Sequence, residues 1–343
     1  MKKILVTGGC GFIGSNFIRR IIDKECFICN IDNLTYAGNL ENLNGIREKK
    51  NYRFIKGDIG DPKIVRSVIS TFDIDTIVNF AAESHVDRSI LGPEIFTKTN
   101  VLGTQVLLDV SRDHWQKRPN GLKGKIFLQI STDEVYGSLG KTGKFREDTP
   151  LSPNSPYSAS KAAADLLVNA YHHTFGYPSI ISRCSNNYGP YQFPEKLIPL
   201  MIINALSGKK LPVYGDGLNV RDWLFVEDHC SAIEAILKKG KAGEIYNIGG
   251  NNEVKNIDVV RMILKRLNKP SSLIQHVTDR LGHDRRYAMD AGKIRKMLGW
   301  KPKLRFEEGL SLTIEWYLEN KSWWKKIISG EYRDYYRKMY KGR

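Results

Sequence analysis

The feature that most constrains the fold is a short apolar run that passes directly into a glycine-rich turn, MKKILVTGGCGFIGS. Gly8, Gly11 and Gly14 follow the spacing G-x-x-G-x-x-G, and Gly9, Gly11 and Gly14 follow G-x-G-x-x-G. A strand, a glycine turn and a helix in this order let backbone amides at a helix N-terminus approach a pyrophosphate. We therefore predict that the chain begins with a dinucleotide-binding βαβ unit.

An acidic residue ends the second apolar run, CFICNID, at Asp32. A carboxylate at this place can bind the adenosine ribose hydroxyls, and it would repel the additional phosphate of NADP. No arginine follows it in NLTYAG, so the sequence favours NAD over NADP. Asp58, which follows YRFIKG, is a second candidate on the adenosine side.

Strand-like and helix-like segments alternate up to about residue 180, which predicts an α/β fold with a doubly wound, mostly parallel sheet of the Rossmann type. After that point proline and glycine become frequent and the apolar runs shorten. We predict an NAD-binding domain over residues 1–185, with returning segments near 220–250, and a smaller C-terminal substrate-binding domain over residues 186–320. A basic aromatic tail occupies residues 321–343.

Composition narrows the class of protein further. The 343 residues are 41% hydrophobic and contain no apolar run near the roughly 18 residues that span a bilayer. The first apolar run is too short for a signal peptide and predicts a strand. Five cysteines without an export signal predict free thiols and a cytoplasmic protein. Cys26 and Cys29 form a C-x-x-C without further ligands nearby, so we predict no metal site.

The net charge of +16 favours a polyanionic partner. The tail from Lys321 carries eight Lys and Arg against two acids, interleaved with Trp and Tyr, a pattern that also suits single-stranded nucleic acid. The other basic residues are scattered and no nucleic-acid motif occurs. We therefore expect the tail to pack on the body as a helix and the partner to be a small anion; a nucleic-acid-binding protein with a structural dinucleotide remains the distant alternative.

Tyr157 and Lys161 lie four residues apart in YSASK, at the start of a helical segment. Residues at this spacing share a helix face. A lysine ammonium beside a phenol stabilises the phenolate and lowers its pKa, which suits a base that removes a hydroxyl proton while hydride leaves the same carbon. In a chain that binds a dinucleotide, this pair predicts oxidation of an alcohol.

Together, the glycine loop, Asp32 and Y-x-x-x-K resemble the extended short-chain dehydrogenase/reductases that act on nucleotide sugars. Within this family the segments NFAAESHVDRSI, STDEVYG, SNNYGPYQFPEKLIP, VRDWLFVEDH and LGHDRRYAMD resemble the dTDP-glucose 4,6-dehydratases. The resemblance covers about residues 2 to 320; Cys10 departs from it, since relatives usually have alanine there. It implies a lyase that removes water from dTDP-glucose, recycles its NAD within each turnover and forms a homodimer through helices near residues 95–115 and 157–175.

The resemblance assigns Asp133 as the acid and Glu134 as the base of the elimination, with Thr132 bonding the sugar. Such an elimination needs two carboxyl groups in opposite protonation states, so the acid needs a raised pKa. Asp133 distinguishes this activity from those of related enzymes. The resemblance implies that epimerases, UDP-glucuronate decarboxylases and GDP-mannose dehydratases lack an aspartate at this position. A 4-epimerase or a dehydratase for a UDP- or GDP-linked sugar is the nearer alternative.

The same resemblance supplies the binding residues. Those expected at the cofactor are Gly8, Gly11, Phe12, Ile13, Gly14, Asp32, Asn33, Leu34, Thr35, Asp58, Ile59, Ala81, Ala82, Ser84, Thr99, Tyr157, Lys161 and Asn187. Those expected at the substrate are Ser84, His85, Thr132, Asn186, Lys196, Leu197, Pro212, Tyr214, Arg221, Asn256, Arg280 and His283. A structural role for His85 fits the sequence equally well, and the sequence does not indicate the nucleobase.

Adjacent acids raise a geometric condition. Side chains alternate along a strand, so Thr132 and Glu134 would share one face while Asp133 points away. Both acids can therefore reach one sugar only if the strand has ended by Thr132 and the chain turns there.

Overall fold

The computed structural model describes residues 2–329. Its main element is a seven-stranded parallel sheet in the order β10-β6-β5-β4-β1-β2-β3. The strands are β1 (Lys2–Thr7), β2 (Cys26–Asp32), β3 (Tyr52–Lys56), β4 (Thr76–Asn79), β5 (Ile126–Thr132), β6 (Ser179–Cys184) and β10 (Ile245–Ile248). This order, in which the chain reverses direction across the sheet after β3, confirms the predicted doubly wound α/β fold.

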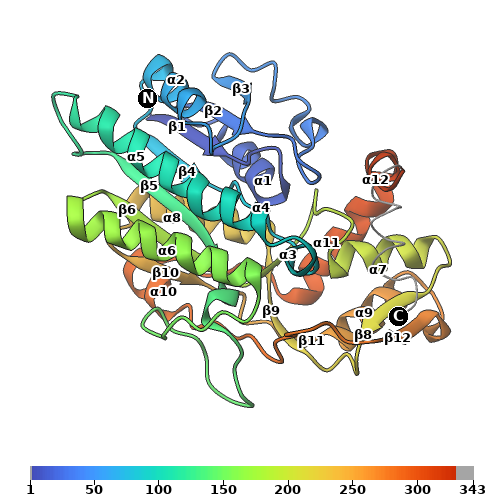
Figure 1. Cartoon of the computed structure of the whole chain (residues 1–343). Helices are drawn as coiled ribbons and strands as arrows, with labels where there is room; N and C mark the ends of the chain where they lie inside the picture. Colours follow the sequence, from blue (N-terminus) through green and yellow to red (C-terminus); the bar gives the residue numbers. More distant parts are fainter. Residues whose placement is uncertain (1, 330–343) are drawn as a thin grey trace.

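Helices cover both faces of this sheet (Figure 1). One face packs on α1 (Phe12–Ile21), α8 (Val226–Lys239) and α10 (Gly292–Leu298), and the other on α2 (Pro62–Phe72), α5 (Gly103–Gln116) and α6 (Pro156–Phe175). The alternation of strand side chains explains this arrangement, because Ile4 and Val6 of β1 join the first apolar cluster while Leu5 joins the second. Cys26 and Cys29 likewise lie buried in opposite clusters, so they do not share a site.

A smaller lobe follows β6. It contains a three-stranded sheet of β7 (Asn186–Tyr188), β9 (Val220–Phe225) and β11 (Glu253–Lys255), and a two-stranded sheet of β8 (Leu211–Tyr214) and β12 (Ile274–Val277). Its helices are α7 (Leu197–Leu206), α9 (Asn256–Arg266), α11 (Phe306–Glu319) and α12 (Lys321–Ile328). Of the segment near 220–250, α8 and β10 return to the main sheet, whereas β9 stays in this lobe.

Short helices complete the path. They are the 3-10 helices η1 (Leu40–Leu43), η3 (Asp133–Tyr136) and η4 (Ser271–Leu273), the short α3 (Val86–Leu91) and α4 (Glu94–Phe96), and the π-helical turn η2 (Thr97–Leu102). Within residues 2–329, no helix is long and apolar enough to cross a membrane.

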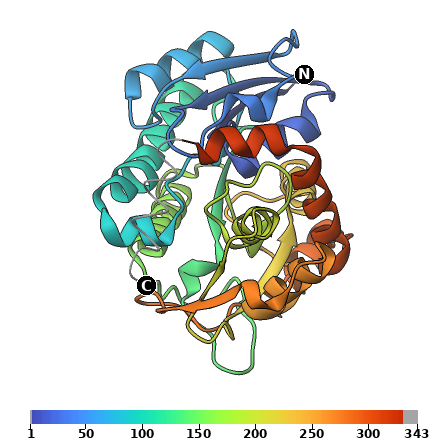
Figure 2. The ribbon, with the colours of Figure 1, turned by 90° about the vertical axis from the view of Figure 1, so that its right-hand side faces the viewer.

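The chain order places the site. β1 and β4 are neighbours although β2 and β3 lie between them in sequence, so the chain leaves these two strands in opposite directions. Open α/β sheets bind ligands in the crevice outside the carboxyl ends of such strands. The smaller lobe lies beside this edge of the sheet (Figure 2), and a cavity forms where the two meet.

Candidate active site

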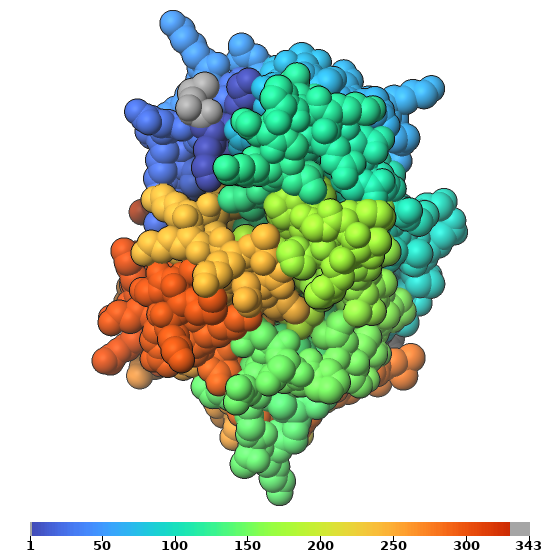
Figure 3. All heavy atoms as spheres, turned by 90° about the vertical axis from the view of Figure 1, so that its left-hand side faces the viewer, coloured from blue at the N-terminus to red at the C-terminus, as the bar shows by residue number. Residues whose placement is uncertain are grey.

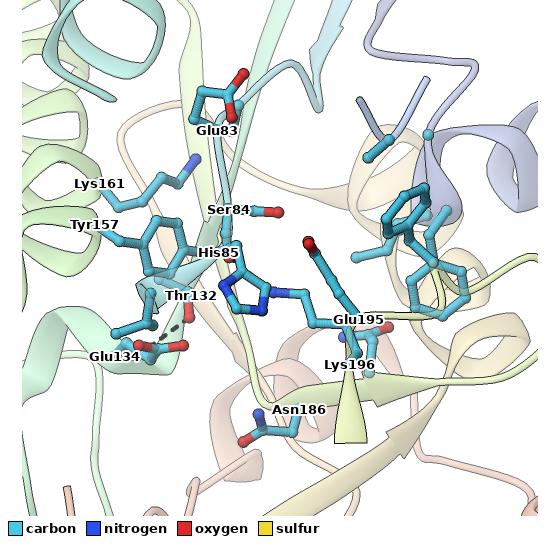
Figure 4. Close-up of a pocket in the computed structure, with 18 of the residues that line it drawn as sticks. Glu83, Ser84, His85, Thr132, Glu134, Tyr157, Lys161, Asn186, Glu195 and Lys196 are labelled. Atoms are coloured by element: carbon cyan, nitrogen blue, oxygen red, sulfur yellow. Dashed lines mark hydrogen bonds between the residues drawn. The ribbon is translucent and has the colours of Figure 1, made fainter. Parts of the chain in front are cut away.

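A cavity of about 430 Å³ lies between the sheet edge and the smaller lobe. With one exception, every site residue predicted from the sequence lines it. Figure 4 shows Tyr157, Lys161, Thr132 and Glu134 on one side of this cavity, with His85 near its centre and Lys196 and Glu195 opposite. Residues from positions 8 to 287 therefore meet in one place.

The glycine loop is shaped for close approach of a phosphate. A Cβ at Gly14 would lie 2.4 Å from the Gly8 carbonyl oxygen. Gly8 adopts a φ of +67°, and a Cβ there would lie 2.8 Å from the backbone of Ala81. Gly11 caps α1 without a side-chain hydrogen bond, so the amides of its first turn face the cavity without a capping oxygen. The loop fits a dinucleotide pyrophosphate.

Asp32 lies at the end of β2, and backbone groups hold both of its carboxylate oxygens. Oδ1 accepts from Leu34 N at 2.8 Å, and Oδ2 accepts from Cys10 N at 2.8 Å. Leu34, the one predicted cofactor residue that does not line the cavity, lies directly behind this lining. With a φ of +55°, it turns the chain so that its amide reaches Asp32. The side chain of Asn33, the residue after Asp32, donates to the Asp58 carboxylate at 3.2 Å.

Tyr157 and Lys161 come from the first turns of α6. Ser155 caps this helix by accepting from Ser158 N at 3.1 Å, and Pro156 occupies its first position. Both reactive side chains are buried in the cavity wall, and Lys161 Nζ donates to the Ile130 carbonyl oxygen at 2.7 Å. The spacing predicted from the sequence therefore places both groups at the end of β5.

The predicted lowering of the phenol pKa is not what this structure gives. Burial, followed by the charge of Glu134, raises the pKa of Tyr157 well above its usual value. Burial also lowers the pKa of Lys161, opposed by the charge of Asp165 one turn further along α6. Desolvation disfavours the charged form of each group, and it is the largest cause of both shifts. Activation of Tyr157 thus needs additional positive charge in the cavity.

The condition on the two acids is met. β5 ends at Thr132 and the chain enters the 3-10 turn of η3 at Asp133, so strand alternation no longer applies. Thr132 Oγ1 accepts from Glu134 N at 3.2 Å and donates to Asp133 Oδ1 at 3.2 Å. A φ of +84° at Gly137 completes the turn. Asp133 and Glu134 both line the cavity.

Their environments separate the two acids. Burial raises the pKa of Asp133 well above its usual range, and the charges of Glu134 and Asp222 add to this. Asp133 is 2% exposed, and its Oδ2 has no hydrogen-bond partner among the described residues. Burial raises the pKa of Glu134 as well, but Lys196, Arg221 and Arg280 oppose it. The first acid therefore favours the protonated form, and the second is closer to ionisation.

Cationic side chains gather at the opposite end of the cavity. Lys196 donates to the Ser84 carbonyl oxygen at 2.9 Å, Arg221 donates to the Asp284 carbonyl oxygen at 2.9 Å, and Arg280 lies 3.4 Å from Asp87. Guanidinium and ammonium groups held in this way suit the oxygens of a diphosphate.

The two histidines of the cavity are neutral near pH 7. Burial, followed by the charge of Lys196, lowers the pKa of His85 well below its usual value. Burial and the charge of Arg280 lower the pKa of His283 to about 4. The positive charge at this end of the cavity therefore comes from the lysine and the arginines.

Sequence reasoning missed a buried polar cluster in the cavity wall. Arg88 pairs with Glu195 at 3.1 Å, and its guanidinium lies 3.8 Å from the ring centre of Tyr36. Glu83 and Glu195 line the cavity, and burial raises the pKa of both. Their adjacency to Ser84 and Lys196 was the only signal available, because the partners lie far apart in the chain.

Two cavity amides have oxygens that still lack a donor. Asn186 Oδ1 and Asn256 Oδ1 are buried without a hydrogen-bond partner in the described part of the chain. Buried polar atoms are normally paired, so their positions mark where a ligand would donate. Histidine, cysteine and acidic side chains do not gather into a group of three that could hold a metal ion anywhere in residues 2–329.

The fold and the site together define the class: an NAD-dependent short-chain dehydrogenase/reductase with a carboxyl pair beside the tyrosine and lysine. The family profile described as GDP-mannose 4,6 dehydratase matches residues 5–313. A dTDP-glucose 4,6-dehydratase of Xanthomonas campestris is 55% identical over 97% of this chain and 98% of its own length. The chain belongs to the dTDP-glucose 4,6-dehydratase family.

Solved structures agree with this assignment. The dTDP-glucose 4,6-dehydratase of Bacillus anthracis, crystallised with NAD, is 52% identical with a TM-score of 0.88, covering 95% of this chain and 100% of that chain. The enzyme of the same name from Streptomyces venezuelae, also with NAD bound, is 47% identical with a TM-score of 0.90, covering 95% and 99%. A UDP-glucose 4-epimerase of Thermotoga maritima reaches a TM-score of 0.85 at 28% identity, so epimerases share the fold at lower identity.

Proposed function

We propose that this chain is an NAD-dependent dTDP-glucose 4,6-dehydratase, a hydro-lyase that forms dTDP-4-keto-6-deoxyglucose. The observation that carries the proposal is the turn at the end of β5, which presents Asp133 and Glu134 to the same cavity as Tyr157. An alcohol dehydrogenase or an epimerase has no use for a second, protonated carboxyl group at this place. Relatives of about 50% identity with this name extend over nearly the whole chain.

The cofactor contacts are assigned to the glycine loop, Asp32 and the Asn33–Thr35 turn on the adenosine side, and to Tyr157, Lys161 and Asn187 on the nicotinamide side. NAD bound by these residues would supply the hydride acceptor for carbon 4 and the hydride donor for carbon 6, and its positive nicotinamide ring would stabilise a Tyr157 phenolate.

Tyr157 removes the proton of the hydroxyl at carbon 4, and Thr132 accepts or donates a hydrogen bond at the same oxygen. The Lys161 ammonium stabilises the phenolate form of Tyr157 before it takes this proton. The resulting ketone acidifies the hydrogen at carbon 5, which prepares the sugar for elimination.

Glu134 removes the proton from carbon 5, and the electron pair of the broken C–H bond forms the double bond between carbons 5 and 6. Asp133 gives its proton to the hydroxyl leaving carbon 6, and this hydroxyl departs as one molecule of water. The raised pKa of Asp133 keeps this proton available near neutral pH. Glu134 then returns its proton to carbon 5 as carbon 6 receives the hydride. Asp133 has lost a proton and Tyr157 has gained one, so a proton must pass from Tyr157 to Asp133, through solvent, before the next turnover.

The nucleotide diphosphate is assigned to the cationic end of the cavity, with Lys196, Arg221, Arg280 and His283, together with Leu197, Pro212, Tyr214 and Asn256. We assign residues 186–320, without the returning segment of α8 and β10, as the domain that binds this half of the substrate. The preference for dTDP rests on the names of the relatives, since the family profile itself bears the name of a GDP sugar.

Incubation with dTDP-glucose, UDP-glucose and GDP-mannose tests the proposal directly. We expect a 4-keto-6-deoxy product, detected by mass spectrometry as loss of one water, with dTDP-glucose converted fastest. A product of unchanged mass with an inverted carbon 4 would indicate an epimerase and would overturn the assignment. Faster conversion of another nucleotide sugar would overturn only the choice of dTDP.

We further infer a homodimer in the cytoplasm. Leu91, Ile95 and Leu102 on the α3–η2 segment and Leu166 and Phe175 on α6 are exposed apolar side chains. Helices α5 and α6 lie side by side on the surface, teal and yellow-green in Figure 3. Segments α3 and η2 both contact α6, so these exposed apolar side chains lie on neighbouring elements, which favours a second copy of the chain. Light scattering should give twice the mass of one chain, and the mass of a single chain would contradict this.

The cytoplasm is inferred from the cysteines. All five are buried free thiols, which suits a reducing compartment.

A further inference from the structure

The C-terminal aromatic segment has no role in the reaction described above. Its helix α12 does not extend into solvent, because Trp323 and Trp324 are 7% and 4% exposed. These rings are therefore not available for stacking on nucleic-acid bases. In Figure 2, α12 (red) lies next to the blue N-terminal half of the sheet domain. Residues 330–343 of the tail lie outside the described part of the chain.

Trp323 reaches the cofactor loop through a chain of hydrogen bonds. Its Nε1 donates to Asn42 Oδ1 at 2.8 Å, in the 3-10 helix η1. Nδ2 of the same Asn42 side chain donates to the carbonyl oxygen of Cys10, in the glycine loop, at 2.8 Å. Cys10 N donates to Asp32 Oδ2 at 2.8 Å. Three bonds thus connect the C-terminal helix to the carboxylate assigned to the adenosine ribose.

A second set of contacts fixes the same elements. Arg19 of α1 donates to the Asn42 carbonyl oxygen at 2.9 Å, and its guanidinium lies 4.9 Å from the ring centre of Tyr191. The Tyr191 ring meets Trp323 edge-on at 6.0 Å. Asn16 on α1 also donates to the Pro190 carbonyl oxygen at 2.9 Å. The helix that starts at the glycine loop is therefore held against the smaller lobe.

We propose that Trp323 and Asn42 are positioning residues for the cofactor, and that α12 is a strap that fixes the adenosine side of the NAD site. This inference rests on the proposed function in one respect: an enzyme that returns hydride to the same sugar must retain its cofactor through the turnover. A site whose backbone is held before binding loses less conformational freedom when the ligand arrives. The hydrogen bonds from Trp323 to Asn42 and from Asn42 to Cys10 supply that restraint, and the first of them joins residues 281 positions apart in the sequence.

The variant Trp323→Phe tests the strap, because it removes the N–H donor and keeps an aromatic ring. Trp324→Phe is the matched control: its indole is equally buried and donates to the Tyr317 carbonyl oxygen at 2.9 Å, within the smaller lobe. Each protein is stripped of cofactor, and its affinities for NAD, ADP-ribose and dTDP are measured by calorimetry. The urea midpoint of each cofactor-free protein is measured in parallel.

We expect Trp323→Phe to weaken NAD and ADP-ribose binding by about fivefold, the effect of one buried hydrogen bond, and to leave dTDP binding unchanged. Trp324→Phe should lower the urea midpoint of the cofactor-free protein about as much as Trp323→Phe does, because each variant loses one buried hydrogen bond. It should leave all three affinities unchanged. Equal NAD affinity in Trp323→Phe and the parent protein would overturn the strap. If the parent protein itself failed to bind NAD, the proposed function would fall instead.

Discussion

The cavity contains two pairs of titratable side chains, and burial and neighbouring charges shift the pKa values of their members differently. Tyr157 and Lys161 lie one turn apart on the same face of α6, and burial disfavours the charged form of both. Asp133 and Glu134 are consecutive residues, and burial again raises both of their pKa values. Only Glu134 has several nearby cations to oppose this effect.

The comparison teaches that pairing alone does not set protonation in a buried site. Desolvation is the first cause in all four groups, and the neighbouring charges then separate the members of each pair. A surface cluster gives the opposite outcome. Glu234 meets Lys24, Arg20 and Lys238, which hold its pKa at about 2 despite partial burial.

The largest effect is expected from the first pair. Tyr157→Phe removes the group that takes the proton at carbon 4, so turnover should fall by about a thousandfold or more. Single-turnover mixing with dTDP-glucose should show no reduced nicotinamide at any time. Retained NAD affinity shows that the fold is intact, and reduction at the parent rate would remove Tyr157 from the oxidation step.

Asp133→Asn should separate oxidation from elimination. Reduced nicotinamide should form at the normal rate and then accumulate, while dehydrated product appears about a hundredfold more slowly. In the parent enzyme the elimination rate should fall as the pH rises through the raised pKa of Asp133, because the acid then loses its proton. Elimination at the parent rate in the variant would contradict the acid role.

Arg280 is one of the three cations that oppose the raised pKa of Glu134, and Arg280→Ala tests its proposed contact with the diphosphate. Loss of a charged partner of the diphosphate should weaken dTDP binding by about tenfold or more, measured by calorimetry, with NAD binding unchanged. Arg285→Ala is the control, because Arg285 is exposed, pairs with Asp216 and lies outside the cavity. It removes the same formal charge. An equal loss of affinity in both variants would indicate a general field effect instead of a contact.

The smallest effect is expected at Glu234, where pairing prevails over burial. Glu234→Gln should lower the free energy of unfolding by about 1–2 kcal/mol at pH 7. Because the folded pKa lies near 2 and the unfolded value near 4.5, the parent gains this stability above pH 4.5 and loses it as the pH falls towards 2. Urea unfolding of both proteins between pH 7 and pH 4 should show a gap that starts to close below pH 5. A gap independent of pH would contradict the ionic origin.

Local patterns predicted a large part of the site. The strand, glycine turn and helix at the N-terminus form a unit within about 20 residues, and the positions of Gly8 and Gly14 follow from backbone geometry alone. The spacing of Tyr157 and Lys161 is likewise a property of one helix. The pKa of Tyr157 was not predictable, since it depends on Glu134 and on burial by several elements.

The sequence alone determined the doubly wound fold and the glycine turn between its first strand and helix, because helix and strand periodicities and turn geometry act over a few residues. The roles predicted for Asp133 and Glu134 came from the family resemblance. Only the tertiary structure decided that the strand ends at Thr132 and that Arg88 meets Glu195 and Tyr36. It also decided that the aromatic tail helix contacts Asn42. These contacts join residues that are distant in the chain, and they form only where the packing of the two lobes brings their side chains within hydrogen-bonding distance.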